Sequence, residues 1–158
     1  MQVLRQVPGN QEACQCGTDP VMAKILIVED DSIIALTIQG RLKQFGYEIA
    51  GRASTGEDAI RKVKELKPDL VLMDIHLKGP MDGIQAAETV YGFYNVPVIY
   101  LTAFSDEKTL ERAQNTSPFG YVIKPFSDDT LRTAIKMALL KDQADKEKQK
   151  IREMHTWD

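Results

Sequence analysis

Four short apolar segments of the chain each end in side chains that could do chemistry. These side chains are Glu29 with Asp30, Asp74, Thr102 and Lys124. Clustered carboxylates repel each other, so three of them in one place suit a hard divalent cation such as Mg2+. A hydroxyl and an ammonium beside them could bind a phosphoryl group and neutralise its charge. If the fold brings them together, these residue types predict Mg2+-dependent phosphoryl chemistry.

Each of these signals also has an ordinary explanation when it is taken alone. An Asp after a strand is a common turn residue, Thr102 could be no more than a helix cap, and Lys124 could be a solvated surface charge. Their order is harder to explain in this way. Two adjacent acids, a third acid, a hydroxyl and a Lys-Pro pair follow one another at segment ends, which favours a single site.

The segments that must position these residues alternate between strand and helix patterns. Short apolar runs rich in β-branched residues predict strands, and the segments between them have helical periodicity. Such an alternation predicts an α/β fold, a doubly wound parallel sheet of five strands with right-handed crossovers and five helices, the last of them extended. In such sheets a ligand site lies beyond the carboxyl ends of the strands. The expected strands are 24–29, 47–53, 69–73, 97–101 and 119–123.

Local signals predict three helix ends. Ser54-Thr-Gly-Glu57 matches a capping box and predicts Ser54 as the N-cap of the second helix. Lys67-Pro68 should end that helix, because the residue before a proline is pushed out of the helical region. Ser127 is expected to cap the last helix.

The length of 158 residues favours one domain with a tail at each end. Residues 1–22 lack periodicity, and we expect them to be a disordered extension or an added leader before a natural start at Met22. Residues 23–141 are expected to form the domain, and residues 142–158 a charged helical tail that acts as a coiled coil or a linker. Cys14 and Cys16 have no further Cys or His nearby for a metal site and are expected to be inert thiols.

The charge balance argues against several partners. The 20 Lys and Arg against 23 Asp and Glu provide no basic field for direct nucleic acid binding and no polybasic membrane anchor. No apolar run approaches the roughly 20 residues that a bilayer requires, and no signal-peptide pattern opens the chain. We therefore expect a cytoplasmic protein.

Four stretches of the chain match the motifs of one known family. They are Ile25-Leu-Ile-Val-Glu-Asp-Asp31, Asp69-Leu-Val-Leu-Met-Asp74, Leu101-Thr-Ala103 and Tyr121-Val-Ile-Lys-Pro-Phe126. Together they resemble the response-regulator receiver domains of two-component signalling systems, over roughly residues 23–141. The resemblance implies a flavodoxin-like sheet with the strand order 2-1-3-4-5. It also implies a phosphorelay switch that changes partner or dimer contacts and turns over no external metabolite.

The resemblance implies a phosphoacceptor and a metal site. Asp74 would attack the phosphorus of a phosphohistidine in a sensor histidine kinase or phosphotransfer protein and form an acyl phosphate. Asp30 and Asp74 would bind Mg2+, Glu29 would do so through water, and the backbone carbonyl of His76 would complete the set.

Residues near the ends of the fourth and fifth strands would respond to the phosphoryl group. Thr102 would hydrogen-bond to it, and Lys124, before a cis peptide bond to proline, would pair with it. Tyr121 matches the aromatic residue that moves inward when the threonine is drawn to the phosphate. His76 and Phe104 match the positions where water approaches the acyl phosphate. Because Phe104 can only exclude water, slow dephosphorylation is expected.

One departure from the common pattern narrows the resemblance. The loop from Asp74 to Gly83 is one residue longer than the commonest loop of the family, and it has Lys78 where proline is usual. This resembles the receivers found beside PAS sensor domains and histidine kinases.

Three other functions compete with this interpretation. An aspartyl-nucleophile phosphatase would have a second acid where this chain has His76. A flavodoxin-like FMN binder would have a Gly-rich phosphate loop after the first strand, where the acids 29–31 would instead repel a phosphate. A pseudo-receiver that acts only through protein contacts would not need the acids, the threonine and the lysine.

The last helix carries a second apolar stripe beyond its core-facing residues. Asp142 and Lys146 are spaced for a favourable pair one helical turn apart. The bland interpretation is a solvated tail, and the other is a helix that relays a signal or forms a homodimer. The stripe has heptad spacing, interrupted by Glu147, and comprises Met137, Leu140, Ala144, Ile151 and Met154.

Overall fold

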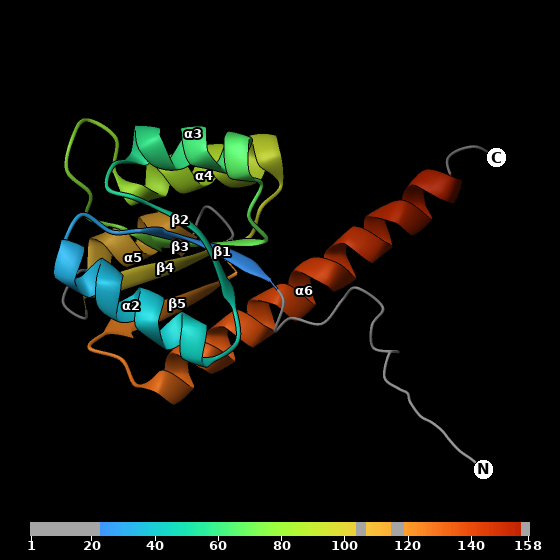
Figure 1. Cartoon of the computed structure of the whole chain (residues 1–158). Coiled ribbons are helices and arrows are strands. Elements are labelled where there is room, and N and C mark those ends of the chain that lie inside the picture. The colour runs from blue at the N-terminus through green and yellow to red at the C-terminus, as the bar shows by residue number, and fades with distance from the viewer. Residues whose placement is uncertain (1–22, 104–106, 115–118, 156–158) are drawn as a thin grey trace, which may run out of the picture.

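A computed structural model describes residues 23–103, 107–114 and 119–155. Within these ranges five strands alternate with five helices, as the sequence patterns predict (Figure 1). The elements are β1 (Lys24–Val28), α2 (Ser32–Gln44), β2 (Glu48–Ala53), α3 (Gly56–Leu66), β3 (Leu70–Asp74), α4 (Gly83–Tyr94), β4 (Val98–Ala103), α5 (Glu107–Gln114), β5 (Gly120–Lys124) and α6 (Asp128–His155).

The five strands form one parallel sheet in the order β2-β1-β3-β4-β5. This confirms both the doubly wound fold and the strand order that the resemblance implies. The order reverses between β1 and β3, which places a crevice outside the carboxyl ends of these strands. Asp74, Thr102 and Lys124 belong to strands, rather than to the loops that follow them.

Two separate hydrophobic cores cover the two faces of the sheet. Successive side chains of a strand point to opposite faces, so Ile25 and Ile27 of β1 pack with α2 and α6, whereas Leu26 and Val28 pack with α3, α4 and α5. All four side chains are fully buried. Helices on both faces explain why the central strands are apolar without alternation. Figure 1 shows α3 and α4 on one side of the sheet and α2 and α6 on the other.

The N-cap of α3 is Thr55, and the prediction of Ser54 was wrong by one residue. The backbone of Thr55 is extended (φ −132°, ψ 162°), and its hydroxyl accepts a hydrogen bond from the backbone N–H of Asp58 at 3.1 Å. Two adjacent hydroxyl residues make the capping motif ambiguous, and the backbone conformation decides between them. The other end is as expected, because α3 ends at Leu66 and is followed by Lys67, whose φ is +49°.

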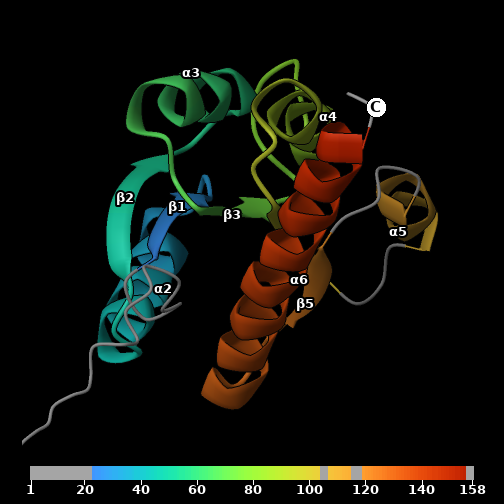
Figure 2. The same ribbon diagram turned by 90° about the vertical axis from the view of Figure 1, so that its right-hand side faces the viewer.

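The last helix, α6, is one continuous helix of 28 residues. The hydroxyl of Ser127 accepts a hydrogen bond from the N–H of Thr130 at 3.1 Å, which confirms the expected cap. The first half of α6 packs on β4 and β5 (Figure 2), and the helix then continues past the sheet (Figure 1). Lys146 pairs with Asp142 at 2.8 Å, as their spacing predicts.

None of the helices in the described ranges combines the length and the apolar composition of a bilayer-spanning segment.

Candidate metal and phosphoryl-transfer site

Three carboxylates meet where β1 and β3 end. Glu29 and Asp30 follow β1, and Asp74 is the last residue of β3, which is hydrogen-bonded to β1. One oxygen from each carboxylate lies within 4.8 Å of the others. Glu29 and Asp74 are only 4% and 5% exposed, so their charges are largely removed from water. The fold thus brings together the three acids that the sequence predicts to bind a metal.

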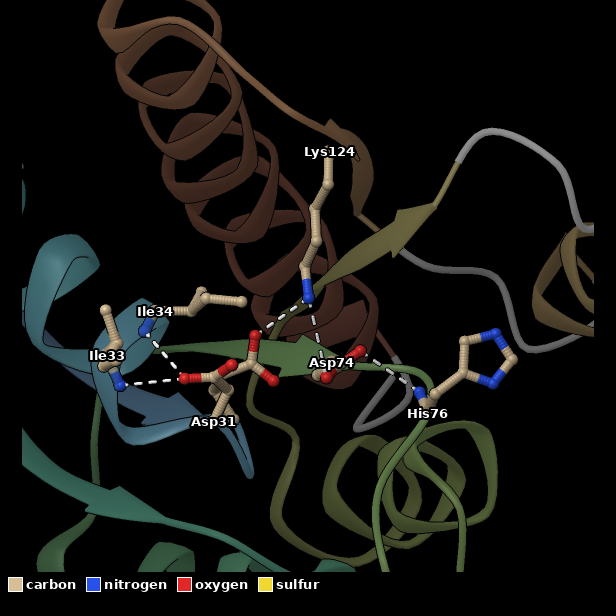
Figure 3. A network of polar contacts seen from close by, with 7 residues as sticks. Asp31, Ile33, Ile34, Asp74, His76 and Lys124 are labelled. Atoms are coloured by element: carbon tan, nitrogen blue, oxygen red, sulfur yellow. Dashed lines mark hydrogen bonds and ion pairs between the residues drawn. The ribbon is translucent and has the colours of Figure 1, made fainter.

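Lys124, from the end of β5, places a positive charge beside two of these acids (Figure 3). Its Nζ lies 2.8 Å from Oε1 of Glu29 and 3.6 Å from Oδ2 of Asp74. Burial on its own would lower the pKa of Lys124, but the hydrogen bond to Glu29 and the nearby carboxylates outweigh it, so the pKa is raised. Lys124 is therefore held as a cation.

The pKa of Glu29 is raised from its usual value. Burial is the largest cause, followed by the hydrogen bond and charge of Asp74, and the ammonium of Lys124 only partly opposes them. The cluster thus contains more negative charge than Lys124 can compensate. Closely spaced carboxylate oxygens with this excess charge fit a hard divalent cation such as Mg2+.

Thr102 stands at the same edge of the sheet. On β4, Leu101 is the residue that pairs with Asp74 of β3. Thr102 is the next residue of β4, one position closer to the carboxyl edge of the sheet. Its side chain is almost fully buried. The next residue of β4, Ala103, pairs with Lys124 on β5. The peptide bond between Lys124 and Pro125 is cis, as the resemblance implies.

The backbone after β3 holds the carboxylate of Asp74. The N–H of His76 donates to Oδ1 of Asp74 at 3.1 Å, while the imidazole of His76 is exposed and points away from this carboxylate (Figure 3). Gly83 then packs directly on this segment. A Cβ at position 83 would lie 2.0 Å from the carbonyl oxygen of Asp74 and 2.8 Å from the Cα of Ile75. Only glycine fits there.

Two helix-capping residues near the site were missed by the sequence reasoning. The carboxylate of Asp31 turns to the N-terminus of α2, where Oδ1 accepts hydrogen bonds from Ile33 at 2.9 Å and Ile34 at 3.3 Å (Figure 3). Asp82 caps α4 in a reciprocal capping box with Gln85. The sequence signal for both residues was an acid directly before a helix pattern. For Asp82 the signal also included Gln85, three residues later.

Of the two aromatic residues expected to act after phosphorylation, Tyr121 and Phe104, the structure describes only Tyr121. The ring of Tyr121 lies 6.1 Å from that of Tyr100, and burial raises the pKa of its hydroxyl. That hydroxyl is buried and has no hydrogen-bond partner among the residues that the structure describes. Phe104 lies outside the described residues.

The fold and the cluster agree with a comparison against protein families. Residues 25–136 match the model of the response regulator receiver domain. The chain belongs to this family. Its curated relatives include the transcriptional regulatory protein PdtaR of Mycobacterium tuberculosis, 38% identical over 119 residues, and the response regulator protein VraR of Staphylococcus saprophyticus, 35% identical over 115 residues. These matches cover 75% and 72% of this chain but only 58% and 54% of the relatives.

Solved receiver structures have the same fold. The signal receiver domain of a modulated diguanylate cyclase from Desulfovibrio desulfuricans matches with 38% identity and a TM-score of 0.75, over 78% of this chain and 98% of that one. The N-terminal domain of a response regulator/sensory box/GGDEF protein from Carboxydothermus hydrogenoformans matches with 40% identity and a TM-score of 0.71, over 77% and 98%. The receiver domain described here is thus a signalling module of two-component systems, similar to receivers joined to sensory and GGDEF modules.

Proposed function

We propose that this receiver domain is a Mg2+-dependent phosphoacceptor switch. Asp74 takes a phosphoryl group from a phosphohistidine of a sensor histidine kinase or phosphotransfer protein, and the change alters partner or dimer contacts. One observation carries the proposal. Asp74 is buried within 4.8 Å of two further carboxylates and within 3.6 Å of an ammonium, at the carboxyl edge of the sheet.

The carboxylate of Asp74 is oriented for attack. Its Oδ1 accepts the N–H of His76, which limits rotation about the side chain. In the transfer, a bond forms between a carboxylate oxygen and phosphorus. The bond from phosphorus to the donor histidine breaks, and its electron pair returns to the imidazole nitrogen. Holding the nucleophile in place removes part of the entropic barrier to this step.

The remaining acids would hold the metal. We assign Asp30 and Asp74 as direct ligands, Glu29 as a ligand through water and the carbonyl of His76 as the backbone ligand. Bound Mg2+ would neutralise the charge between these carboxylates and the incoming phosphoryl oxygens. Without that neutralisation the acids would repel the phosphoryl group.

The hydroxyl of Thr102 and the ammonium of Lys124 would bind the phosphoryl oxygens. Lys124 now contacts Glu29 more closely than Asp74, at 2.8 Å against 3.6 Å, so it must move from the first acid toward the new phosphoryl group. Tyr121 is the aromatic residue that would follow Thr102.

The lifetime of the acyl phosphate is assigned to Phe104 and His76. Phe104 would exclude water from the line of attack, and Phe104→Glu should release phosphate about tenfold faster, which requires only about 1.4 kcal/mol in the barrier. Decay of the labelled protein in Mg2+ measures this. An unchanged decay rate with normal labelling would remove the role of Phe104.

Labelling with acetyl phosphate tests the phosphoacceptor. The parent should take up phosphate only with Mg2+, and Asp74→Asn should take up none. Asp31→Asn is the matched control, because it makes the same chemical change beside the site while asparagine caps a helix as well as aspartate does. It should label normally.

Four results would contradict the proposal. Full labelling of Asp74→Asn would exclude Asp74, and retained tight Mg2+ binding by Asp30→Ala would exclude the metal site. A folded parent that never labels would be a pseudo-receiver, and turnover of a phosphomonoester would indicate a phosphatase.

A further inference from the structure

One face of α6 is used by the receiver domain itself. Leu131, Ile135, Ala138 and Leu139 belong to the core on the α2 side of the sheet. Asp142, one turn further, is also buried. These five positions define the domain-facing side of α6.

The opposite face of α6 carries exposed apolar side chains, which we call the α6 stripe. At 3.6 residues per turn, the stripe is centred about 180° from the domain-facing side. Its large apolar side chains are 51–72% exposed. Nothing in the described part of the chain covers it. The stripe consists of Met137, Leu140, Ala144, Glu147, Ile151 and Met154.

The spacing of the stripe indicates that its binding partner is another helix. Its six positions are separated by three and four residues in strict alternation, which is the a and d pattern of a coiled coil. A repeat of 3.5 residues stays on one side of a helix only when two helices wind around each other. The stripe runs from Met137 to Met154, about 26 Å at 1.5 Å per residue. A second copy of the chain has the same pattern over the same length.

The charges of the stripe fit a second copy in one particular arrangement. Glu147 occupies a d position, and Lys148 follows it at an e position. In a parallel, in-register pair, a d side chain packs beside the e residue of the other helix. Each Glu147 would therefore meet Lys148 of the other copy. Ala144, one turn earlier, leaves room for the longer glutamate side chain.

We propose that a second copy of this chain binds the α6 stripe as a parallel, in-register two-helix coiled coil. The two receiver domains then lie at the same end, on the outer sides of the helix pair, because each occupies the far face of its own α6. Ala144 and Glu147 leave four large apolar layers, so association is weak and depends on concentration. The inference needs no phosphoryl group and is therefore independent of the role of Asp74.

Sedimentation equilibrium of the full chain tests the interface. The parent should show a monomer–dimer equilibrium, and Ile151→Lys should be monomeric at the same concentrations. Gln149→Lys is the matched control, since it adds the same charge two residues away on the other side of the helix, and it should dimerise like the parent. Glu147→Leu removes the charged layer and should strengthen dimerisation at least tenfold.

Several results would overturn the proposed pairing of two α6 helices. A parent that stays monomeric at millimolar concentration, or a dimer that Ile151→Lys leaves intact, would overturn the proposal. A parent trimer would overturn the two-helix arrangement. Circular dichroism of each variant checks that α6 is still helical.

Disulfide cross-linking tests the orientation. In a background with Cys14→Ser and Cys16→Ser, Ala144→Cys should form a cross-linked dimer, because parallel pairing places each position 144 opposite its own copy. Antiparallel pairing would place position 144 opposite 147, so that only a mixture of Ala144→Cys and Glu147→Cys would cross-link. That second result would overturn the parallel arrangement.

Discussion

At the scale of single residues, Lys124 holds the charges of the site together. Its ammonium contacts Glu29 and Asp74 from a side chain that is 25% exposed. Lys124→Met should destabilise the metal-free protein by about 2 kcal/mol, because it leaves buried carboxylates without their counter-ion. Mg2+ should stabilise this variant more than it stabilises the parent, since the cation replaces the lost charge. Thermal unfolding with Mg2+ and with a chelator measures both effects.

A lysine outside the site provides the control for this prediction. Lys43 is exposed in the last turn of α2. Lys43→Met should change stability by less than about 0.5 kcal/mol, and Mg2+ should stabilise it as it does the parent. If Mg2+ stabilised both lysine variants equally, Lys124 would not be coupled to the metal site.

Tyr121 gives a prediction that depends on pH. Its buried hydroxyl lacks a partner among the described residues, so Tyr121→Phe should stabilise the protein by about 1 kcal/mol at pH 7. Burial raises the pKa of the hydroxyl. Above the ordinary value of about 10, the unfolded chain therefore loses this proton before the folded protein does, and the parent loses stability as pH rises.

Urea unfolding at pH 7, 9 and 10.5 gives the free energies of unfolding of the parent and of Tyr121→Phe. The advantage of the phenylalanine variant should grow at the highest pH. A variant that is less stable than the parent at pH 7 would mean that the hydroxyl has a partner.

The convergence of the site residues could be predicted from the sequence, but their pairing could not. Parallel strands place their carboxyl ends at one edge, so the meeting of Asp30, Asp74 and Lys124 followed from the element pattern alone. That Lys124 lies closest to Glu29 depends on the rotamers of two long side chains. Among three consecutive acids, only the local backbone shows that Asp31 turns to the N-terminus of α2 and not to the carboxylate cluster.

At the scale of elements, the contact of α4 with β3 constrains the backbone at Asp74 and Ile75. Gly83→Ala should cost about 3 kcal/mol, because the new Cβ would meet the backbone of Asp74 and Ile75, which cannot move aside as a flexible side chain could. Labelling at Asp74 should fall as well. Chemical denaturation and acetyl phosphate labelling measure the two effects.

The same helix provides a matched substitution. A Cβ at Gly92 meets nothing within 4 Å. Gly92→Ala should therefore stabilise the protein by up to about 1 kcal/mol, since alanine favours the helix, and labelling should be unchanged. Equal effects of the two substitutions would show that the close approach at Gly83 does not constrain the site.

Element bounds were predicted best where the pattern had one solution. The strands lie within one or two residues of their expected positions, because apolar runs flanked by polar residues fix them. The cap of α3 was displaced because Ser54 and Thr55 satisfy the same motif. The tertiary link from Arg112 of α5 to Asp82, at 3.0 Å, had no sequence signal, since it joins residues 30 positions apart.

At the scale of the whole molecule, stability should be uneven along α6. The amides of β1 and β3 lie between two cores. In contrast, all described side chains of α6 after residue 145 are exposed. In dilute solution, hydrogen exchange should be slow in these strands and in residues 131–139, and fast in residues 146–154. Mass spectrometry of peptides measures this.

Raising the protein concentration provides the control for that measurement. Dimerisation through the α6 stripe should slow exchange in residues 146–154 and leave the strands unchanged. Uniform protection along α6 at all concentrations would mean that the helix is stable without a partner.

The net charge of the site has a consequence for its choice of cation. Carboxylates that bind a metal do so deprotonated. In that form the three acids and one ammonium carry a formal charge of minus two, which one divalent ion cancels. A potassium ion would cancel only half of this charge, while a trivalent lanthanide would reverse its sign. Selection against the monovalent ions of the cell therefore follows from valence, even before ion size is considered. Terbium, whose luminescence is easily followed, should therefore bind at this site more tightly than Mg2+ does.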